Sequence, residues 1–315
     1  MGLRAVAFAL LALAGTSTLA ETLGVRGTAT LLEVYGAETG TVYANGAPAP
    51  CCFIATGATA RDAGNNWQWI GAVDAGADVL YRFDQSGVRT SLVLPANHRV
   101  EALAFDLPRN ELVALLQDRL LDRRVVQRHA AATGAVLATS VVADSTGSQL
   151  RAGVSTWSAT RRAFLVIGQR SIDPAVGLLS IGHDGLMQFF ASPDAGDTQA
   201  LAVDPANGNL FALRHLSATA TTVLHRITLG GSNAGFVAIG SGEAGCCFVL
   251  AGTSVIDGGR FQSFAYPIGS TTATLYRFDL VTGAASPLPT SNPSAGLQVD
   301  AALPVTAFLF RDGFE

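Results

Sequence analysis

Lysine is absent from this sequence, and all twenty basic residues are arginines. Schiff-base chemistry, pyridoxal phosphate attachment and Walker-type phosphate binding each use a lysine amine, so the sequence excludes them. Charge of either sign is scarce, at 14% of the 315 residues, and the net charge is −4. Removal of the first twenty residues, which include Arg4, would make it about −5. An acidic, sparsely charged chain is unsuited to phosphate backbones, so we expect no nucleic-acid partner.

Long hydrophobic runs are also lacking beyond the N-terminus. Residues 5–14 are apolar, follow Arg4 and precede small residues that end at Ala20. This pattern predicts a secretory signal peptide over residues 1–20, cleaved after Ala20. A run of about ten apolar residues is too short to cross a membrane, and no later segment approaches the roughly twenty required. No cysteine stands near the cleavage site to carry a lipid. We therefore expect a secreted or periplasmic protein without a transmembrane span.

Several familiar signatures of chemistry are missing. The chain has no G-x-S-x-G, and no combination of serine, histidine and acid can be singled out. Its five histidines show no metal-ligand spacing on a shared element. The turn aspartates at 62, 106, 204, 257 and 300 recur too regularly to form one catalytic site, so we interpret them as turn formers that accept local backbone hydrogen bonds. We expect no metal and no cofactor, except calcium if the protein is an enzyme.

What the sequence does contain is a repeated hairpin. An apolar strand is followed by a Gly-containing turn and a second β-prone strand. The copies are Leu31–Asn45, Leu80–Leu94, Val125–Ser140, Leu178–Ser192, Val223–Ile239 and Leu275–Leu288. Their turn glycines, Gly40, Gly87, Gly134, Gly185, Gly230 and Gly283, recur with a period near 48 residues, which is in the range of β-propeller blades.

A second hairpin, richer in small residues, alternates with the first. It begins at Val100, Ala152 and Gln199, and looser copies turn near Asp62, Asp257 and Asp300. Two hairpins per period predict four-stranded blades, with the small-residue strands at the crowded centre. The chain starts with an outer hairpin and ends with an inner one. We therefore expect an all-β, six-bladed β-propeller over residues 21–310, closed when the N-terminal outer hairpin pairs with the C-terminal inner hairpin.

The strand-and-turn rhythm, as in LYRFDLVTG and LAVDPANGNLFAL, resembles the secreted bacterial propeller repeats of the YVTN and NHL-like kind. The resemblance implies a propeller fold and a binding role, without a substrate. The last residues, 311–315, are similar to a short tail ending in DGFE on exported proteins of some Gram-negative bacteria, which implies a sorting signal. Alternatively, Leu309 and Phe310 simply finish the last strand.

The four cysteines lie in two similar sequence segments, one pair in each. Cys51-Cys52 and Cys246-Cys247 each precede a Leu-Tyr-Arg-Phe-Asp sequence by 29 residues, and the copies lie 195 residues apart. That distance is about four periods, so the pairs would lie far apart around a six-bladed ring, beyond the roughly 7 Å between Cα atoms that a disulfide spans. Cysteines of an exported protein are expected to be oxidised. We therefore predict vicinal disulfides, Cys51–Cys52 and Cys246–Cys247, which stiffen a loop or form an apolar platform for a ligand.

The cysteine pairs mark a loop type that leads into an inner strand, near the channel mouth. His98 and Arg99 lie in another loop of this type. Cys51, Cys52, His98, Arg99, Cys246 and Cys247 are therefore our candidate ligand-binding residues, and no catalytic residue can be named. Among acids in the inner strands, Glu101 is the clearest.

Two classes of function remain open. We expect a monomeric, noncatalytic module that binds a small molecule, a glycan or a protein at the channel mouth. The alternative is a propeller enzyme of the lactone hydrolase or lyase type with its site at the same mouth. A quinone-cofactor dehydrogenase is a third reading, although such proteins usually have more blades and tryptophan-rich repeats.

Overall fold

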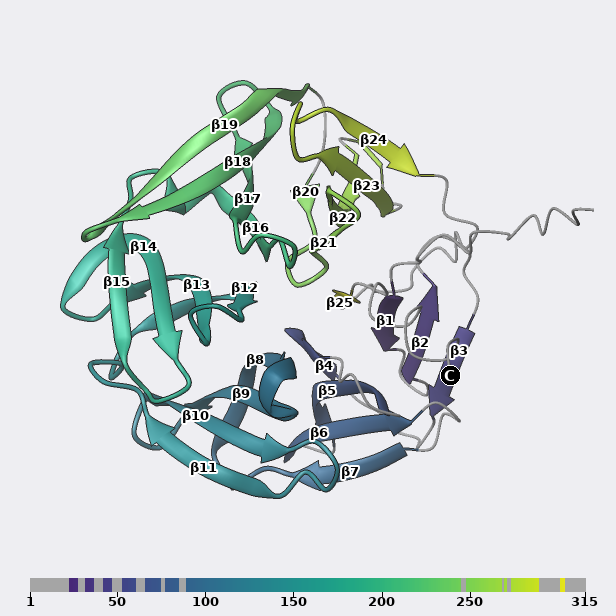
Figure 1. Ribbon diagram of the computed structural model, residues 1–315, viewed down its shortest axis with the longest axis vertical. Coiled ribbons are helices and arrows are strands. Elements are labelled where there is room, and N and C mark those ends of the chain that lie inside the picture. Colours follow the sequence, from purple (N-terminus) through teal and green to yellow (C-terminus); the bar gives the residue numbers. More distant parts are fainter. Residues whose placement is uncertain are drawn as a thin grey trace, which may run out of the picture.

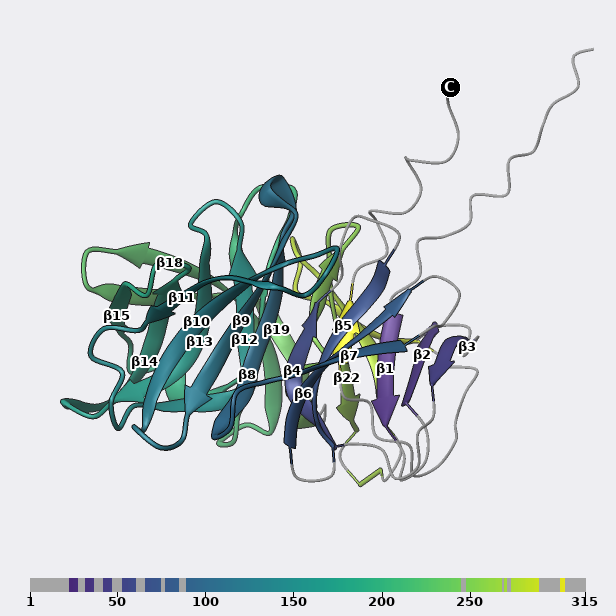
Figure 2. The same ribbon diagram turned by 90° about the horizontal axis from the view of Figure 1, so that it is seen from below.

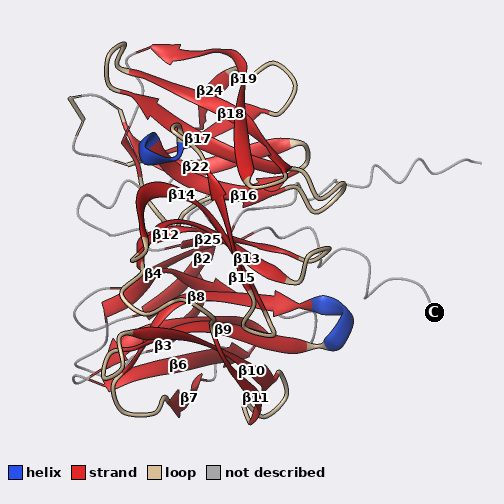
Figure 3. Cartoon of the chain, turned by 90° about the vertical axis from the view of Figure 1, so that its left-hand side faces the viewer, coloured by secondary structure: helices blue, strands red, loops and turns tan. Residues whose placement is uncertain are grey.

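The computed structural model describes residues 23–27, 32–36, 42–46, 53–60, 66–74, 77–84, 89–244, 248–267, 269–270, 273–288 and 301–303. Strands dominate this part of the chain, and its only helices are two short 3₁₀ turns, η1 (Leu107–Arg109) and η2 (Ala195–Asp197) (Figure 3). The strands form antiparallel sheets that stand around a common centre (Figure 1). Seen from the side, the strands run between the two faces of the ring (Figure 2).

Each sheet begins with a strand near the centre and continues outward. One sheet contains β4 (Phe53–Ala60), β5 (Asn66–Asp74), β6 (Ala77–Asp84) and β7 (Arg89–Val93). The next contains β8 (His98–Asp106), β9 (Glu111–Asp118), β10 (Arg123–Ala130) and β11 (Val136–Val141). A later sheet places β20 (Phe248–Val249) and β21 (Val255–Asp257) along β22 (Arg260–Tyr266), followed by β23 (Thr274–Asp279) and β24 (Ala285–Leu288).

Two further groups of four strands share one sheet. Their strands are β12 (Gln149–Ser158), β13 (Ala163–Arg170), β14 (Asp173–Gly182) and β15 (Met187–Ala191), then β16 (Thr198–Val203), β17 (Leu210–Leu216), β18 (Thr221–Gly230) and β19 (Asn233–Ala244). The outer strands β15 and β19 join them through one parallel pair, Ala191 with Asn233. The amide of Ala191 also donates to the carbonyl of Ser232 at 2.8 Å.

The six predicted outer hairpins and the three clear inner ones are confirmed. The outer copies correspond to the strand pairs β2–β3, β6–β7, β10–β11, β14–β15, β18–β19 and β23–β24. The three clear inner copies are β8–β9, β12–β13 and β16–β17. Gly134, Gly185 and Gly283 have positive φ angles in their turns. The conformation that glycine favours is therefore used where the repeat predicts a turn.

The sheet that unites the two ends differs from the expected pairing of two hairpins. Its order is β25 (Ala301–Leu303), β1 (Leu23–Gly27), β2 (Leu32–Gly36) and β3 (Val42–Gly46). β1 pairs with β25 on one side and with β2 on the other. The N-terminal segment thus supplies three of these strands, because β1 takes the place next to the inner strand that the sequence analysis assigns to C-terminal residues. β1 begins three residues after Ala20, the expected cleavage position.

The hydrophobic core lies between successive sheets. One cluster joins Ala58 and Leu80 of the first sheet to Leu112 and Leu116 of the next, and all four are fully buried. Other clusters join β8–β11 to β12–β15 and the latter to β16–β19. Full burial of a leucine contributes about 1.5–3 kcal/mol. The inner strands supply small residues such as Ala102, which suits the converging centre.

Arginines connect neighbouring sheets through polar contacts. Arg162, between β12 and β13, reaches Asp106 at the end of β8, and its Nε and Nη2 atoms lie 2.9 and 2.8 Å from Oδ2. Arg119 pairs in the same manner with Asp78 of β6. The interpretation of Asp106 as a local turn former is therefore wrong, because its side chain caps nothing locally and bonds to the next sheet. Asp204 does accept the amide of Ala206, at 3.0 Å, as expected of a turn former.

Two histidines are buried within the sheets and should make stability depend on pH. His129 is 0% exposed and His225 is 4% exposed. Burial lowers the pKa of His129, opposed by the carbonyl of Gly134. Burial also lowers the pKa of His225; the carbonyl of Val223 opposes this, the charge of Arg214 adds to it, and Asp194 opposes it.

A histidine whose folded-state pKa is lowered takes up its proton more readily in the unfolded chain, where the pKa is about 6.5. Stability is then fully present above that pH and is lost as the pH falls below it. We expect the thermal midpoint to be constant between about pH 7 and 8 and to decline toward pH 5. His129→Leu should lower the midpoint at pH 7.5 but give a shallower decline. Equal slopes for variant and wild type in a calorimetric pH series would contradict this assignment.

Candidate functional site

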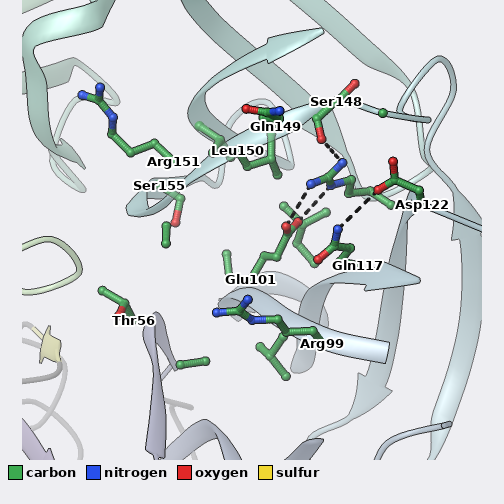
Figure 4. Close-up of a pocket in the computed structure, with 18 residues that line it drawn as sticks. Thr56, Arg99, Glu101, Gln117, Asp122, Ser148, Gln149, Leu150, Arg151 and Ser155 are labelled. Carbon is green, nitrogen blue, oxygen red and sulfur yellow. Dashed lines mark hydrogen bonds and ion pairs between the residues drawn. The ribbon is translucent and has the colours of Figure 1, made fainter. Parts of the chain in front are cut away.

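A polar cavity of about 440 Å³ lies at the end of the central space where the inner strands begin, which we call the entry mouth. Its walls come from the first halves of β4, β8 and β12, the end of β9 and the turn that leads to β10 (Figure 4). The polar lining consists of Thr56, Arg99, Glu101, Gln117, Asp122, Arg124, Ser148, Gln149, Arg151 and Ser155. Three alanines, two leucines, two valines and a glycine complete the lining, so the cavity offers hydrogen-bonding groups on a partly apolar wall.

Glu101 and Arg124 form a closed ion pair in the wall. The Nε and Nη2 atoms of Arg124 lie 3.2 and 3.1 Å from the two carboxylate oxygens of Glu101. The arginine side chain is only 4% exposed and also donates to the carbonyls of Ser145 and Ser148. Such a two-point pairing is strong and geometrically specific. Both oxygens of Glu101 are therefore engaged, which makes it a poor general base or calcium ligand.

Arg99 has a different environment. Its side chain is exposed, and it makes no hydrogen bond or ion pair with another residue in the described part of the chain. Figure 4 shows its guanidinium directed into the open space bordered by Thr56 and Glu101. Figure 4 shows Arg151 on the other side of this space, with its guanidinium directed away from Arg99, and it donates one hydrogen bond, to the carbonyl of Thr198 at 2.5 Å. Most of the N–H groups of these two arginines are available to a ligand.

Strand register explains how these residues meet. Arg99 of β8 lies opposite Gln117 of β9, and Gln117 lies opposite Arg124 of β10. Gln117 donates to Asp122 at 3.5 Å, in the turn between β9 and β10. Arg99, Gln117 and Arg124 thus lie side by side on three consecutive strands, at the end of the sheet that borders the polar cavity.

The candidate residues from the sequence fall into three groups. Arg99 lines the cavity, whereas His98 does not, and its Nδ1 atom lies 3.2 Å from the carbonyl of Ala96. Cys51, Cys52, Cys246 and Cys247 lie outside the described residues, so their predicted disulfides and ligand contacts stay predictions. In the sequence, the pairs directly precede β4 and β20.

Arg124 and Arg151 are not among the ligand-binding residues predicted from the sequence. The sequence does contain a pattern that points to Arg151. The two segments that begin with a cysteine pair align with a third segment that has no cysteine and contains Arg151. CCFIATG ends at Gly57, GSQLRAG at Gly153 and CCFVLAG at Gly252. The spacings between these glycines, 96 and 99 residues, correspond to about two periods each. The residue two positions before the glycine is Ala55, Arg151 or Leu250, so only the middle copy carries a charge.

The three glycines meet where the inner strands converge, and we call them the glycine girdle. All have positive φ angles, +74° at Gly57, +72° at Gly153 and +78° at Gly252. The amide of Gly252 donates to the carbonyl of Gly153 at 2.8 Å. A Cβ atom on Gly57 would lie 2.8 Å from the Cα of Gly153. Main chain from three different sheets therefore approaches too closely for any side chain.

The girdle lies between the polar cavity and a second, apolar one. Thr56 and Ala152, each directly before a girdle glycine, line the polar cavity. The glycines themselves line the apolar cavity of about 320 Å³, toward the mouth where the inner strands end. Ser155 borders both. The apolar cavity includes Trp157, whose ring meets Phe164 edge-on with centroids 5.0 Å apart.

Within the described residues, no group of three or more His, Cys, Asp or Glu side chains could hold a metal ion. A search of the same residues for a helix long and apolar enough to cross a membrane finds none.

Comparison with solved structures shows a β-propeller-like fold. A protein of unknown function from Bacteroides caccae matches with a TM-score of 0.60 and 11% identity, over 90% of this chain and 98% of that one. TolB from Acinetobacter baumannii matches with a TM-score of 0.53 and 10% identity, over 90% of this chain and 66% of that one. A chain of a nidogen/laminin complex matches with a TM-score of 0.51 and 13% identity, over 84% of this chain and 91% of that one. At these identities the likeness concerns the fold alone. No protein family and no curated protein matches the sequence.

Proposed function

We propose that this protein is an exported six-bladed β-propeller, closed through β1 and β25, that binds a small ligand in its polar cavity without transforming it. The cavity itself carries the proposal, because it presents two arginines with available N–H groups while its only inner-strand acid, Glu101, is held by Arg124. Ligand sites are typically concave and of this size, with a few converging polar groups. The signal-peptide pattern of residues 1–20 supports export to the periplasm or the medium.

The enzyme alternative has less support. It would rely on Glu101, whose two oxygens are occupied, and a candidate general base needs a free position within hydrogen-bond reach of its substrate. Thermal stabilisation by millimolar calcium alone would favour that alternative over a binding function.

A blocked cavity tests the proposal. The exposed side chain of Ala152 lines the cavity, so Ala152→Trp should fill it while leaving the fold intact. We expect compounds that raise the thermal midpoint of the wild type, from a panel of monosaccharides, sugar acids and tripeptides, to lose that effect in the variant. The midpoint without ligand should change by no more than about 3 °C, as for other surface substitutions.

Substitution of Leu137 by tryptophan is the matched control, because Leu137 lies exposed on the outer strand β11. Stabilisation that persists in Ala152→Trp, or a panel that has no effect on the wild type, would contradict the proposed function.

A further inference from the structure

We propose that the ligand of the polar cavity is a hydroxylated monocarboxylate, such as a uronic acid, whose carboxylate is bound by Arg99, with Arg151 as a second cation on the cavity wall. This inference rests on the binding function proposed above and adds the chemical class of the ligand. It follows from the charges of the cavity, the chemistry of arginine and the remaining lining.

Among the described residues that line the cavity, positive side chains exceed negative ones by one. The lining includes the cations Arg99, Arg124 and Arg151 and the acids Glu101 and Asp122. Glu101 and Arg124 neutralise each other, so the residual charge lies on the side of Arg99 and Arg151. The whole chain, in contrast, has a net charge of −4. A positive cavity in an acidic protein cannot be a by-product of general basicity.

Arginine favours oxyanions, because the planar guanidinium presents paired N–H groups that match the two oxygens of a carboxylate or phosphate. A single excess charge suits a monoanion. Asp122, which lines the same cavity, would repel the second charge of a phosphate monoester. The observations therefore favour a carboxylate over a phosphate.

Arg151 also departs from the repeat that surrounds it. At the equivalent position, the other two copies of the aligned segment before the glycine girdle have Ala55 and Leu250. The scaffold therefore does not need a charge there. Two copies border the cavity, through Ala55 and through Arg151, and only one of them has a guanidinium there, which is expected if that group contacts a ligand rather than supporting the fold.

The rest of the lining indicates hydroxyl groups on the ligand. Thr56, Ser155 and Gln149 provide side-chain donors and acceptors, and no hydrogen bond of their side chains is found among the described residues. The volume of about 440 Å³ exceeds that needed by a bare anion. A sugar acid offers a carboxylate and several hydroxyls in one molecule of suitable size.

Isothermal titration calorimetry with D-galacturonate, its uncharged methyl ester, D-galactose and galactose 1-phosphate separates these alternatives, with gluconate as a second acid. We expect the wild type to bind at least one acid and to prefer it to its neutral and phosphorylated counterparts by about tenfold or more. Arg99→Gln and Arg151→Gln should each weaken that binding by about tenfold. Arg161→Gln, at an exposed arginine outside the cavity, is the matched control.

The outcomes distinguish this inference from the function on which it rests. Equal affinity for galacturonate and its ester, tighter binding of the phosphate, or failure of both acids to bind would overturn the carboxylate assignment. In each of these cases the proposed function survives if another compound, from the panel of monosaccharides, sugar acids and tripeptides, stabilises the wild type and loses that effect in Ala152→Trp. Unchanged acid binding in both arginine variants would also overturn the assignment. Circular dichroism of the variants, expected to match the wild type, checks that each has folded.

Discussion

Replacement of Gly153 by alanine should remove a large part of the stability of the fold. The added Cβ atom would lie 2.8 Å from the amide nitrogen of Gly252 and 2.9 Å from the carbonyl carbon of Ala251. Both are main-chain atoms of another sheet, which cannot rotate away as a side chain can. The substitution would also disturb the hydrogen bond from the amide of Gly252 to the carbonyl of Gly153.

Three costs add at this position. A left-handed φ costs alanine about 1–2 kcal/mol, overpacking about 1–3 kcal/mol, and a lost hydrogen bond about 1 kcal/mol. The sum, about 3–6 kcal/mol, is a large part of the roughly 5–15 kcal/mol that stabilises a typical protein. We expect urea denaturation to show this loss, or the soluble yield to collapse if the variant does not fold.

Gly231 offers a matched control. Its φ angle is also positive, +59°, but a Cβ atom there would meet nothing within 4 Å. Gly231→Ala should therefore cost only the conformational term, about 1–2 kcal/mol. If both variants lose equal stability, close approach of the main chain at the girdle is not what requires glycine.

The repeat could be predicted from the sequence because it depends on local properties. Apolar strands, turn glycines and their period identify hairpins without knowledge of their neighbours. β1 was missed because Leu23–Gly27 is one short strand without a hairpin partner of its own in the repeat. The glycine girdle was missed for another reason: Gly57, Gly153 and Gly252 are required by contacts between sheets. Their shared place at the end of three aligned segments relates them to one another, but it does not show that their main chains touch.

The candidate site was predicted only in part. The prediction that His98 and Arg99 lie in a loop is wrong, because they are the first two residues of β8, but Arg99 does line the cavity at the predicted end of the inner strand. The pairing of Glu101 with Arg124, 23 residues later, depends on the register of β8, β9 and β10. Register across three strands follows from the packed sheet, so composition and spacing alone could not reveal that Glu101 is occupied.

The second large effect is expected at the contact between Arg162 and Asp106. Asp106 is only 1% exposed, and Arg162 donates a hydrogen bond from Nε to one of its oxygens, with Nη2 in ion-pair contact with the same oxygen. Removal of one partner leaves a buried carboxylate without compensation, which costs about 3–5 kcal/mol in a fully buried pair. Because the side chain of Arg162 is 23% exposed and solvent screens part of the interaction, we expect about 2–4 kcal/mol for Arg162→Asn. Asparagine is chosen because Arg162 has a φ of +51°, which asparagine tolerates.

Two further variants show whether the lost stability arises from the stranded charge. Arg109, 3.7 Å from the same carboxylate but 46% exposed, should contribute less than about 1 kcal/mol, so Arg109→Ala serves as the control. Adding Asp106→Asn to Arg162→Asn should restore part of the stability, because the buried group is then neutral. Urea midpoints of the four proteins measure these differences. If the double variant is less stable than Arg162→Asn alone, the arginine contributes packing between β8–β11 and β12–β15 rather than charge compensation. In that case the loss should also persist at high salt, because packing is not screened.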